Sequence, residues 1–264
     1  MTTTRPAAVA GSFYSGDAEV LSREVDGLME RATPVSGRPH AFIVPHAGFD
    51  YSGPIAATVY AHLARRDPLP TRVVLLGPSH HVAFTGLALP GCDAFETPLG
   101  TIPLDVEGLR RALELPQVRV LPSAHAREHS LEVQLPFLQR VLPRFTLVPL
   151  VVGDASPTQV AEVLEALWGG DETVVLISSD LSHFHAWSDA RALDGHTARR
   201  IVALDAEPLD GDEACGCRPV NGLLEVARRQ GLTATALDLR NSGDTAGDRS
   251  RVVGYGAFAF EARP

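Results

Sequence analysis

Short apolar runs alternate along the chain with longer segments in which apolar residues recur every three or four positions. The runs that read as buried strands cover residues 40–48, 71–81, 145–154, 172–183 and 251–262. The segments with helical periodicity cover residues 52–66, 106–114, 128–143 and 156–168, the last with Ser156 as N-cap and Pro157 after it. Residues 86–105 are rich in turns and predict a β-hairpin region. This alternation predicts an α/β fold, with a mostly parallel or mixed sheet flanked by helices in a single domain over residues 1–264.

Three of the predicted strands are followed by histidine or aspartate side chains. "FIVPHAG" ends at His46, "VVLLGPSHH" at His80 and His81, and "VVLISSDLSHFH" at Asp180 and His183. In open parallel sheets, ligands bind outside the carboxyl ends of the strands. We therefore expect these side chains to share one pocket. The alternative is that each histidine is an ordinary hydrogen-bonded turn residue.

Histidines gathered in one pocket suit a transition metal. Imidazole binds iron, zinc and copper, and two histidines with one anionic ligand on the same side of iron(II) leave open positions for substrate or oxygen. The anionic candidates are Asp180, Glu128, Glu132, Cys215 and Cys217. Spacing alone does not choose among them.

Composition excludes several other functions. The net charge is −9, so a basic nucleic-acid interface is not expected. All 23 basic residues are arginine, which excludes a P-loop lysine and a Schiff-base lysine. Three cysteines do not indicate a disulfide framework. With no apolar run near the ~20 residues of a membrane span and no signal-peptide pattern, we expect a cytoplasmic protein that does not bind membranes.

Five motifs together resemble one family. They are "PHAGFDYSG" (45–53), "GPSHH" (77–81), "EHSLEVQLPFL" (128–138), "SSDLSHF" (178–184) and "CGCRPVNGLL" (215–224). Their order is that of the Memo family, whose bacterial and archaeal members are called AmmeMemoRadiSam system protein B. The opening "AVAGSFYSGD" and the closing "VVGYGAFAF" also fit, so the resemblance covers nearly the whole chain.

The resemblance implies a fold similar to that of the class III extradiol (LigB-like) dioxygenases, which open catechol rings with iron(II). Carried over by motif, the metal ligands would be His46, His80 and Cys215, with the cysteine in the place of a glutamate. Iron(II) is the expected metal. Copper and zinc are alternatives because a thiolate is a softer ligand than a carboxylate. The family pattern is often C-G-R-x-P, whereas here Cys217 adds a second thiol, which leaves Cys217 as an alternative ligand.

Other site residues follow from the same resemblance. His129 and His183 would act as acid–base groups, and Asp180 would line the pocket. From their positions in the chain rather than from the resemblance, we also expect Phe49 and Tyr51, which closely follow His46, and His81 next to the substrate; the alternatives are core packing for the two aromatic residues and packing beneath the site for His81. Glu128 and His129 are predicted to open a helix. On that helix, Glu128 and Glu132 would lie one turn apart, which is also typical of a solvated helix start.

The predicted function is oxidative cleavage of a catechol-like or other chelating small molecule. The alternative is a non-catalytic metal- or peptide-binding module. Either form would act with partner proteins of the AMMECR and radical SAM types, as the family name implies.

Overall fold

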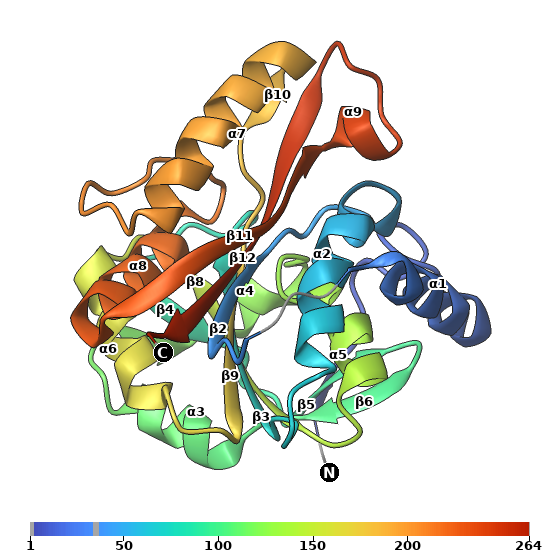
Figure 1. Cartoon of the computed structure of the whole chain (residues 1–264). Coiled ribbons are helices and arrows are strands. Elements are labelled where there is room, and N and C mark those ends of the chain that lie inside the picture. Colours follow the sequence, from blue (N-terminus) through green and yellow to red (C-terminus); the bar gives the residue numbers. More distant parts are fainter. Residues whose placement is uncertain (1–2, 34–36, 264) are drawn as a thin grey trace.

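The computed structural model describes residues 3–33 and 37–263, and its centre is a mixed β-sheet (Figure 1). Nine strands of the described chain form this sheet. Across the sheet the order is β10 (His183–His185), β12 (Val252–Ala262), β2 (Ala41–Val44), β9 (Thr173–Ser178), β3 (Arg72–Pro78), β8 (Thr146–Val152), β4 (Leu87–Leu89) and β7 (Val118–Val120). β11 (Leu232–Asn241) pairs antiparallel with β12. The predicted α/β fold is confirmed, and its central sheet is mixed: β2, β9, β3 and β8 run parallel, whereas β12 pairs antiparallel with β10, β11 and β2, and β4 pairs antiparallel with β8.

Strands β2, β9, β3 and β8 are parallel neighbours, so their carboxyl ends lie at one edge. In β9, Val174 and Leu176 face one hydrophobic core while Val175 and Ile177 face the other. This alternation explains the continuous apolar runs, because a strand covered on both faces needs apolar residues at every position. Val44 of β2 is in register with Ser178 of β9. The residues that follow these two strands are therefore brought close together.

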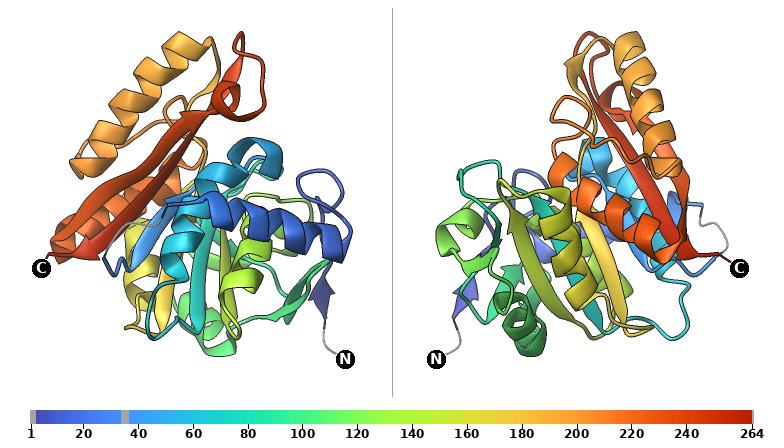
Figure 2. Two further views of the ribbon diagram at one scale, coloured as in Figure 1. Left: turned by 45° about the vertical axis from the view of Figure 1, so that its right-hand side comes forward. Right: turned by 90° about the vertical axis from the view of Figure 1, so that its left-hand side faces the viewer.

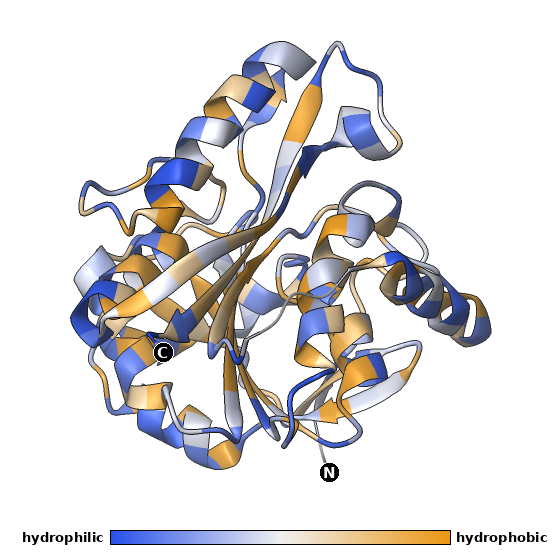
Figure 3. Cartoon of the chain, viewed as in Figure 1, coloured by the Kyte–Doolittle hydropathy of each residue, from blue (hydrophilic) through white to orange (hydrophobic). Residues whose placement is uncertain are grey.

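Helices cover both faces of the sheet (Figure 2). One core is closed by α1 (Ala18–Arg31), α2 (Phe49–Leu63), α4 (Pro122–Ala126) and α5 (Leu135–Val141). The other is closed by α3 (Val106–Leu113), α6 (Pro157–Leu167), α7 (Trp187–Val202) and α8 (Cys217–Gln230). Apolar residues gather toward the sheet, and polar residues lie on the outward sides of the helices (Figure 3). The hydroxyl of Ser156 caps α6 as predicted, with Pro157 as its first residue.

The predicted hairpin region is divided between two sheets. β4 joins the main sheet beside β8, whereas β5 (Ala94–Thr97) and β6 (Gly100–Pro103) form a hairpin in a small sheet with β1 (Thr4–Arg5). The prediction of one hairpin over residues 86–105 was therefore wrong in its first part. The sequence pattern shows turns but does not show which sheet a three-residue strand joins.

The predicted helix over residues 128–143 is also corrected. The chain forms a 3₁₀ turn, η1 (Glu132–Gln134), and α5 begins only at Leu135. Glu128 lies before these helices, where its carboxylate accepts the backbone N–H of Ser130. Such local side-chain bonds compete with the start of a helix. Glu128 and Glu132 are both buried, so the reading of a solvated helix start is wrong.

The C-terminal part of the chain extends the sheet beyond the helical layers. Here α7, the β11–β12 pair and the short α9 (Ser242–Thr245) project to one side (Figure 2). β11 has ten residues and β12 has eleven. No described helix is both long and apolar enough to cross a membrane.

Candidate metal centre

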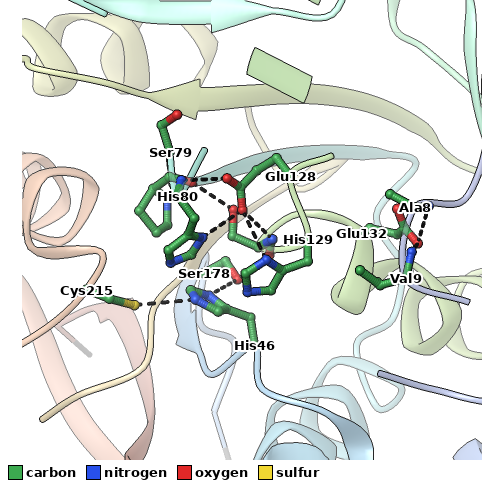
Figure 4. A network of polar contacts seen from close by, with 12 residues as sticks. Ala8, Val9, His46, Ser79, His80, Glu128, His129, Glu132, Ser178 and Cys215 are labelled. Atoms are coloured by element: carbon green, nitrogen blue, oxygen red, sulfur yellow. Dashed lines mark hydrogen bonds and ion pairs between the residues drawn. The ribbon is translucent and has the colours of Figure 1, made fainter. Parts of the chain in front are cut away.

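Three donor side chains meet at the carboxyl edge of the sheet (Figure 4). His46 follows β2, His80 follows β3, and Cys215 precedes α8. One ligand atom from each lies within 4.8 Å of the others. The predicted convergence of strand ends is thus seen for His46 and His80, whose ring centroids lie 5.3 Å apart. The parallel strands bring His46 and His80 together, and the Cys215 backbone N–H, which donates to the Asp180 carbonyl at 3.2 Å, holds the thiol beside the end of β9.

The ring of His46 is oriented by Ser178, the last residue of β9. The Nδ1 atom lies 2.9 Å from the Ser178 hydroxyl oxygen. That hydroxyl donates its only proton to the carbonyl of Ser130 at 2.5 Å and accepts the amide N–H of Gln134 at 2.9 Å. Ser178 can therefore only accept from the ring, so Nδ1 of His46 carries the proton. The Nε2 lone pair is left for a metal, 3.3 Å from the Cys215 sulfur.

The ring of His80 is oriented in the same way by Glu128. Nδ1 lies 2.8 Å from one carboxylate oxygen, and the backbone N–H of His80 donates to the other oxygen at 2.6 Å. Burial alone would raise the pKa of Glu128, but the hydrogen bonds from His80 and Ser130 lower this pKa to about 2. The carboxylate is charged at neutral pH. It holds the proton on Nδ1 and directs Nε2 of His80 toward the other donors.

Cys215 reaches the site because Gly216 lets the chain pass close to β9. A Cβ at position 216 would lie 2.7 Å from the Ser179 side chain. The backbone N–H of Asp180 donates to the Cys215 sulfur at 3.3 Å. Burial raises the pKa of this thiol, with the Asp180 charge as a second cause. A bound cation would reverse that balance, because a metal-coordinated thiol is deprotonated.

The donor set fits a transition metal. Two imidazoles and one thiol are typical ligands of iron, zinc or copper. Within the described chain, a second group of close donors joins His80 to Glu128 and His129. The Glu128 oxygens already accept three hydrogen bonds from His80 and Ser130, so we favour the group of His46, His80 and Cys215. Cys217 belongs to neither group and packs partly against the core beneath α8.

Asp180 lies behind the donors and is buried. Its Oδ1 accepts the backbone N–H of His46 at 2.7 Å. Burial raises the pKa of Asp180 to about 7, although the His46 hydrogen bond opposes this shift. The side chain thereby ties the end of β9 to the end of β2. Its placement makes it a positioning group for His46 at the wall of the site.

His129 lies beside the donors rather than among them. Its ring stacks on His80 with centroids 4.6 Å apart, and the ring of Phe13 covers it at 4.7 Å. Burial is the main cause that lowers the pKa of His129 to about 4, and the neighbouring His80 ring adds to this shift. This imidazole is neutral at pH 7. His81 is exposed. Its ring is roughly perpendicular to the His129 ring, with the two ring centroids 6.3 Å apart.

The remaining predicted residues lie at different depths. His183 is half-buried, its Nδ1 bonds the Leu181 carbonyl, and burial lowers its pKa. Tyr51 stands on the first turn of α2 with 44% of its surface exposed. Phe49 is 2% exposed, and its ring packs against the Phe137 ring with the centroids 4.8 Å apart. Phe49 therefore takes the core-packing role that was the alternative to a pocket wall.

The N-terminal segment is fastened to the site by a buried carboxylate. Glu132 pairs with Arg5 at 2.7 Å and accepts the hydroxyl of Tyr14 at 2.7 Å. It also accepts the backbone N–H groups of Ala8 and Val9 (Figure 4). These bonds hold the segment that delivers Phe13 to His129. The sequence pattern did not indicate this role, because Glu132 falls within a motif that also suits a solvated helix.

A cavity of about 530 Å³ adjoins the donors on the side of the thiol. Cys215, Cys217 and Ser79, the residue before His80, contribute to its wall. The rest of the wall includes Pro78, Val82, Phe84, Val152, Arg218 and Pro219. This volume is typical of a small-molecule site.

Comparisons with known proteins show what the chain is similar to. The model of the Memo-like protein family matches residues 5–259. A "MEMO1 family protein" of Ignicoccus hospitalis is 38% identical over 97% of this chain and 98% of its own length. One of Aquifex aeolicus is also 38% identical, with the same coverage. The crystal structure of an uncharacterised Escherichia coli K12 protein, JW3007, has a TM-score of 0.51 at 13% identity and covers 84% of this chain and 100% of its own. That likeness concerns the fold alone.

Proposed function

Since this chain belongs to the Memo-like protein family, we propose that His46, His80 and Cys215 hold one iron(II) ion and that the centre oxidatively cleaves a chelating, catechol-like small molecule. One observation carries the proposal. Both histidines have Nδ1 bound by an acceptor within 2.9 Å, and both present Nε2 to the same space as the Cys215 sulfur. Bound iron(II) would supply the redox chemistry that a reaction with dioxygen requires.

The protein groups around the centre prepare the substrate. His129 is neutral at pH 7 because burial lowers its pKa to about 4, so its unprotonated nitrogen can accept a hydrogen bond from a substrate hydroxyl. Its stacking between His80 and Phe13 fixes the direction in which it accepts. His183, also uncharged because burial lowers its pKa, is the second acid–base candidate.

The thiol makes copper and zinc alternatives to iron. A thiolate is softer than the carboxylate of the usual facial triad and suits copper(I) and zinc as well. It is also open to oxidation by the oxygen used in the reaction. A Memo-like protein that binds metal without turnover is therefore the second candidate. Partners of the AMMECR and radical SAM types belong to the same proposal and would be tested by co-purification.

Metal content after anaerobic purification tests the proposed centre. We expect about one metal ion per chain, lost in Cys215→Ala and His80→Ala. Two matched controls, Cys92→Ala and the exposed His196→Ala, should keep the metal. Metal retained in both site variants would refute the ligand set. Oxygen consumption by the iron-loaded protein with a panel of catechols then separates the two candidates, because the non-catalytic module would consume none.

A further inference from the structure

Helix α7 lies on the outer side of the unit that projects from the sheet (Figure 2). It packs on β10, β11 and β12 through one face, whose residues are buried: Ala190, Asp194, Thr197, Ala198 and Ile201. The opposite face carries exposed residues: Ser188, Asp189, Ala192, His196 and Arg199. Because the helix has sixteen residues, this outward face is about 24 Å long.

The middle of the outward face is built from small and apolar residues. Ala192 and Gly195 lie near its centre, with Leu193 and Val202 on its two flanks. Leu193 is 43% exposed and Val202 is 41% exposed, so both leave apolar surface in water. Small residues let a second helix approach closely, and the apolar flanks gain free energy when that helix covers them. This composition fits a helix–helix contact better than a solvated surface.

Opposite charges mark the two ends of the same face. Asp189 lies in the first turn of α7 and Arg199 in the last. Both are exposed, and neither belongs to an ion pair of the described chain. They are ten residues apart (199 − 189), which is about 15 Å along the helix axis. If two copies of α7 pack antiparallel about a two-fold axis near residue 194, Asp189 of each copy meets Arg199 of the other.

The segments beyond the two ends of α7 repeat this arrangement of charge. Past the carboxyl end, the loop toward α8 carries three exposed acidic residues that form no ion pair within the described residues: Glu207, Asp210 and Asp212. At the amino end, the guanidinium carbon of Arg249 lies 4.9 Å from the centre of the Trp187 ring. That of Arg251 lies 4.6 Å from the centre of the Phe184 ring. Antiparallel helices would set the acidic loop of one copy against these arginines of the other.

Two aspartates close to these arginines bind other groups. Asp244 accepts the indole N–H of Trp187 at 2.7 Å, and Asp248 accepts the hydroxyl of Ser250 at 2.7 Å. Arg249 donates a long bond of 3.4 Å to the Gly243 carbonyl. The stacked guanidinium groups therefore keep most of their N–H donors for a partner.

Phe184 gives this end of the surface an aromatic anchor. Its ring is 60% exposed, and its φ of 66° is a conformation that a bulky residue rarely adopts. The residue sits where the pairing of β10 with β12 shifts register, between His183 and His185. Strained residues of this kind are concentrated at functional sites. Aromatic and arginine side chains also supply much of the binding energy of protein interfaces.

We propose that the chain forms a symmetric dimer in which two α7 helices pack antiparallel. Asp189 of each copy pairs with Arg199 of the other, and the acidic loop of each copy faces Arg249 and Arg251 of the other. Each contact occurs twice, because the same surface serves on both copies. The opposed dipoles of the two helices add to the attraction. The dimer does not depend on the metal centre.

Sedimentation of the native chain and of charge variants over a range of concentrations tests the dimer. Asp189→Arg and Arg199→Glu each bring like charges together twice, so we expect self-association to weaken about 100-fold or more. The double variant Asp189→Arg/Arg199→Glu should dimerise as the native chain does. An equimolar mixture of the two single variants should form a mixed dimer. Arg144→Glu, which reverses an exposed charge elsewhere, is the matched control.

Each other outcome contradicts the proposal at a definite point. A native chain that sediments as a monomer at every concentration would overturn the dimer. A dimer that both single variants retain would overturn the α7 surface, because another surface would then hold it. Loss in both single variants, with recovery in neither the mixture nor the double variant, would show that Asp189 and Arg199 do not meet. Thermal melting of each variant confirms that it is folded, so that loss of the dimer is not loss of the fold.

Discussion

The Nδ1 atom of His46 lies 2.9 Å from the hydroxyl oxygen of Ser178, whose own proton goes to the Ser130 carbonyl. A serine thereby determines which ring nitrogen of a metal-ligand candidate stays unprotonated. Ser178→Ala removes the acceptor, so the ring can rotate and take either tautomer. We expect metal affinity to fall 10–100-fold, as for other groups that orient metal ligands. Competition with a metal-binding dye measures this change, with the exposed Ser188→Ala as control. Unchanged affinity in Ser178→Ala would show that the hydroxyl does not orient the ligand.

The acid sensitivity of the fold should depend on His125. This imidazole is buried, and burial lowers its pKa to about 4. Between pH ~6.5 and ~4 the unfolded chain binds a proton that the folded chain excludes, so the free energy of unfolding falls as pH falls. One such group contributes a slope of about 1.4 kcal/mol per pH unit. We expect His125→Gln to reduce the slope of the metal-free protein by about that amount in denaturant titrations at pH 7.5, 6 and 5. A slope equal to that of native protein would contradict this assignment.

Gly77, the first residue of "GPSHH", is required by close packing. A Cβ there would lie 2.7 Å from the Ser130 hydroxyl and 2.9 Å from the Leu131 side chain. Gly77→Ala should push away the loop that carries Glu128, at a cost of about 1–3 kcal/mol in stability. Metal affinity should fall with it, because Glu128 orients His80. Gly211→Ala, where a Cβ meets no atom within 4 Å, is the control. Native-like melting of Gly77→Ala would mean that the loop adapts freely.

Glu132 should be among the most sensitive acidic residues. Its carboxylate pairs with Arg5 in the interior, with side-chain exposures of 0% and 6%. Glu132→Gln leaves the guanidinium without a counter-charge, which costs about 3–5 kcal/mol for a buried pair. The exposed Glu207→Gln should change stability by less than about 0.5 kcal/mol. Urea unfolding of the two variants compares them directly. Similar midpoints would indicate that water reaches Arg5 in the variant.

The sequence predicted the strands that carry the donors because each has a strong local signal. Apolar runs predict β2 and β3, and β2 ends directly before Pro45, whereas β3 continues through Gly77 to Pro78. The position of the donors at one edge of the sheet could be predicted, because the carboxyl ends of parallel strands lie at the same edge. The order β2, β9, β3 could not be predicted, because pairing of strands depends on contacts between segments far apart in the chain.

The supporting residues were missed because their types are common at the surface. Ser178, Gln134 and Phe13 act through tertiary contacts, and no spacing marks them. β11, with the sequence "LTATALDLRN", lacks an apolar run because much of it is not buried. Glu128 was considered as a ligand, whereas its hydrogen bonds make it a partner of His80. A buried Gln134 within an apolar segment was the one available signal of a polar network.

The last strand of the sheet has a consequence for synthesis of the protein. β2, which leads to His46, is covered on one side by β9 and on the other by β12. While the chain emerges from the ribosome, β2 stays an open edge until residues 252–262 arrive, and Cys215 is also absent until late. Open edges invite pairing with other chains. The nascent protein therefore passes most of its synthesis with an exposed strand, and the proposed donor set is complete only once Cys215 has been made.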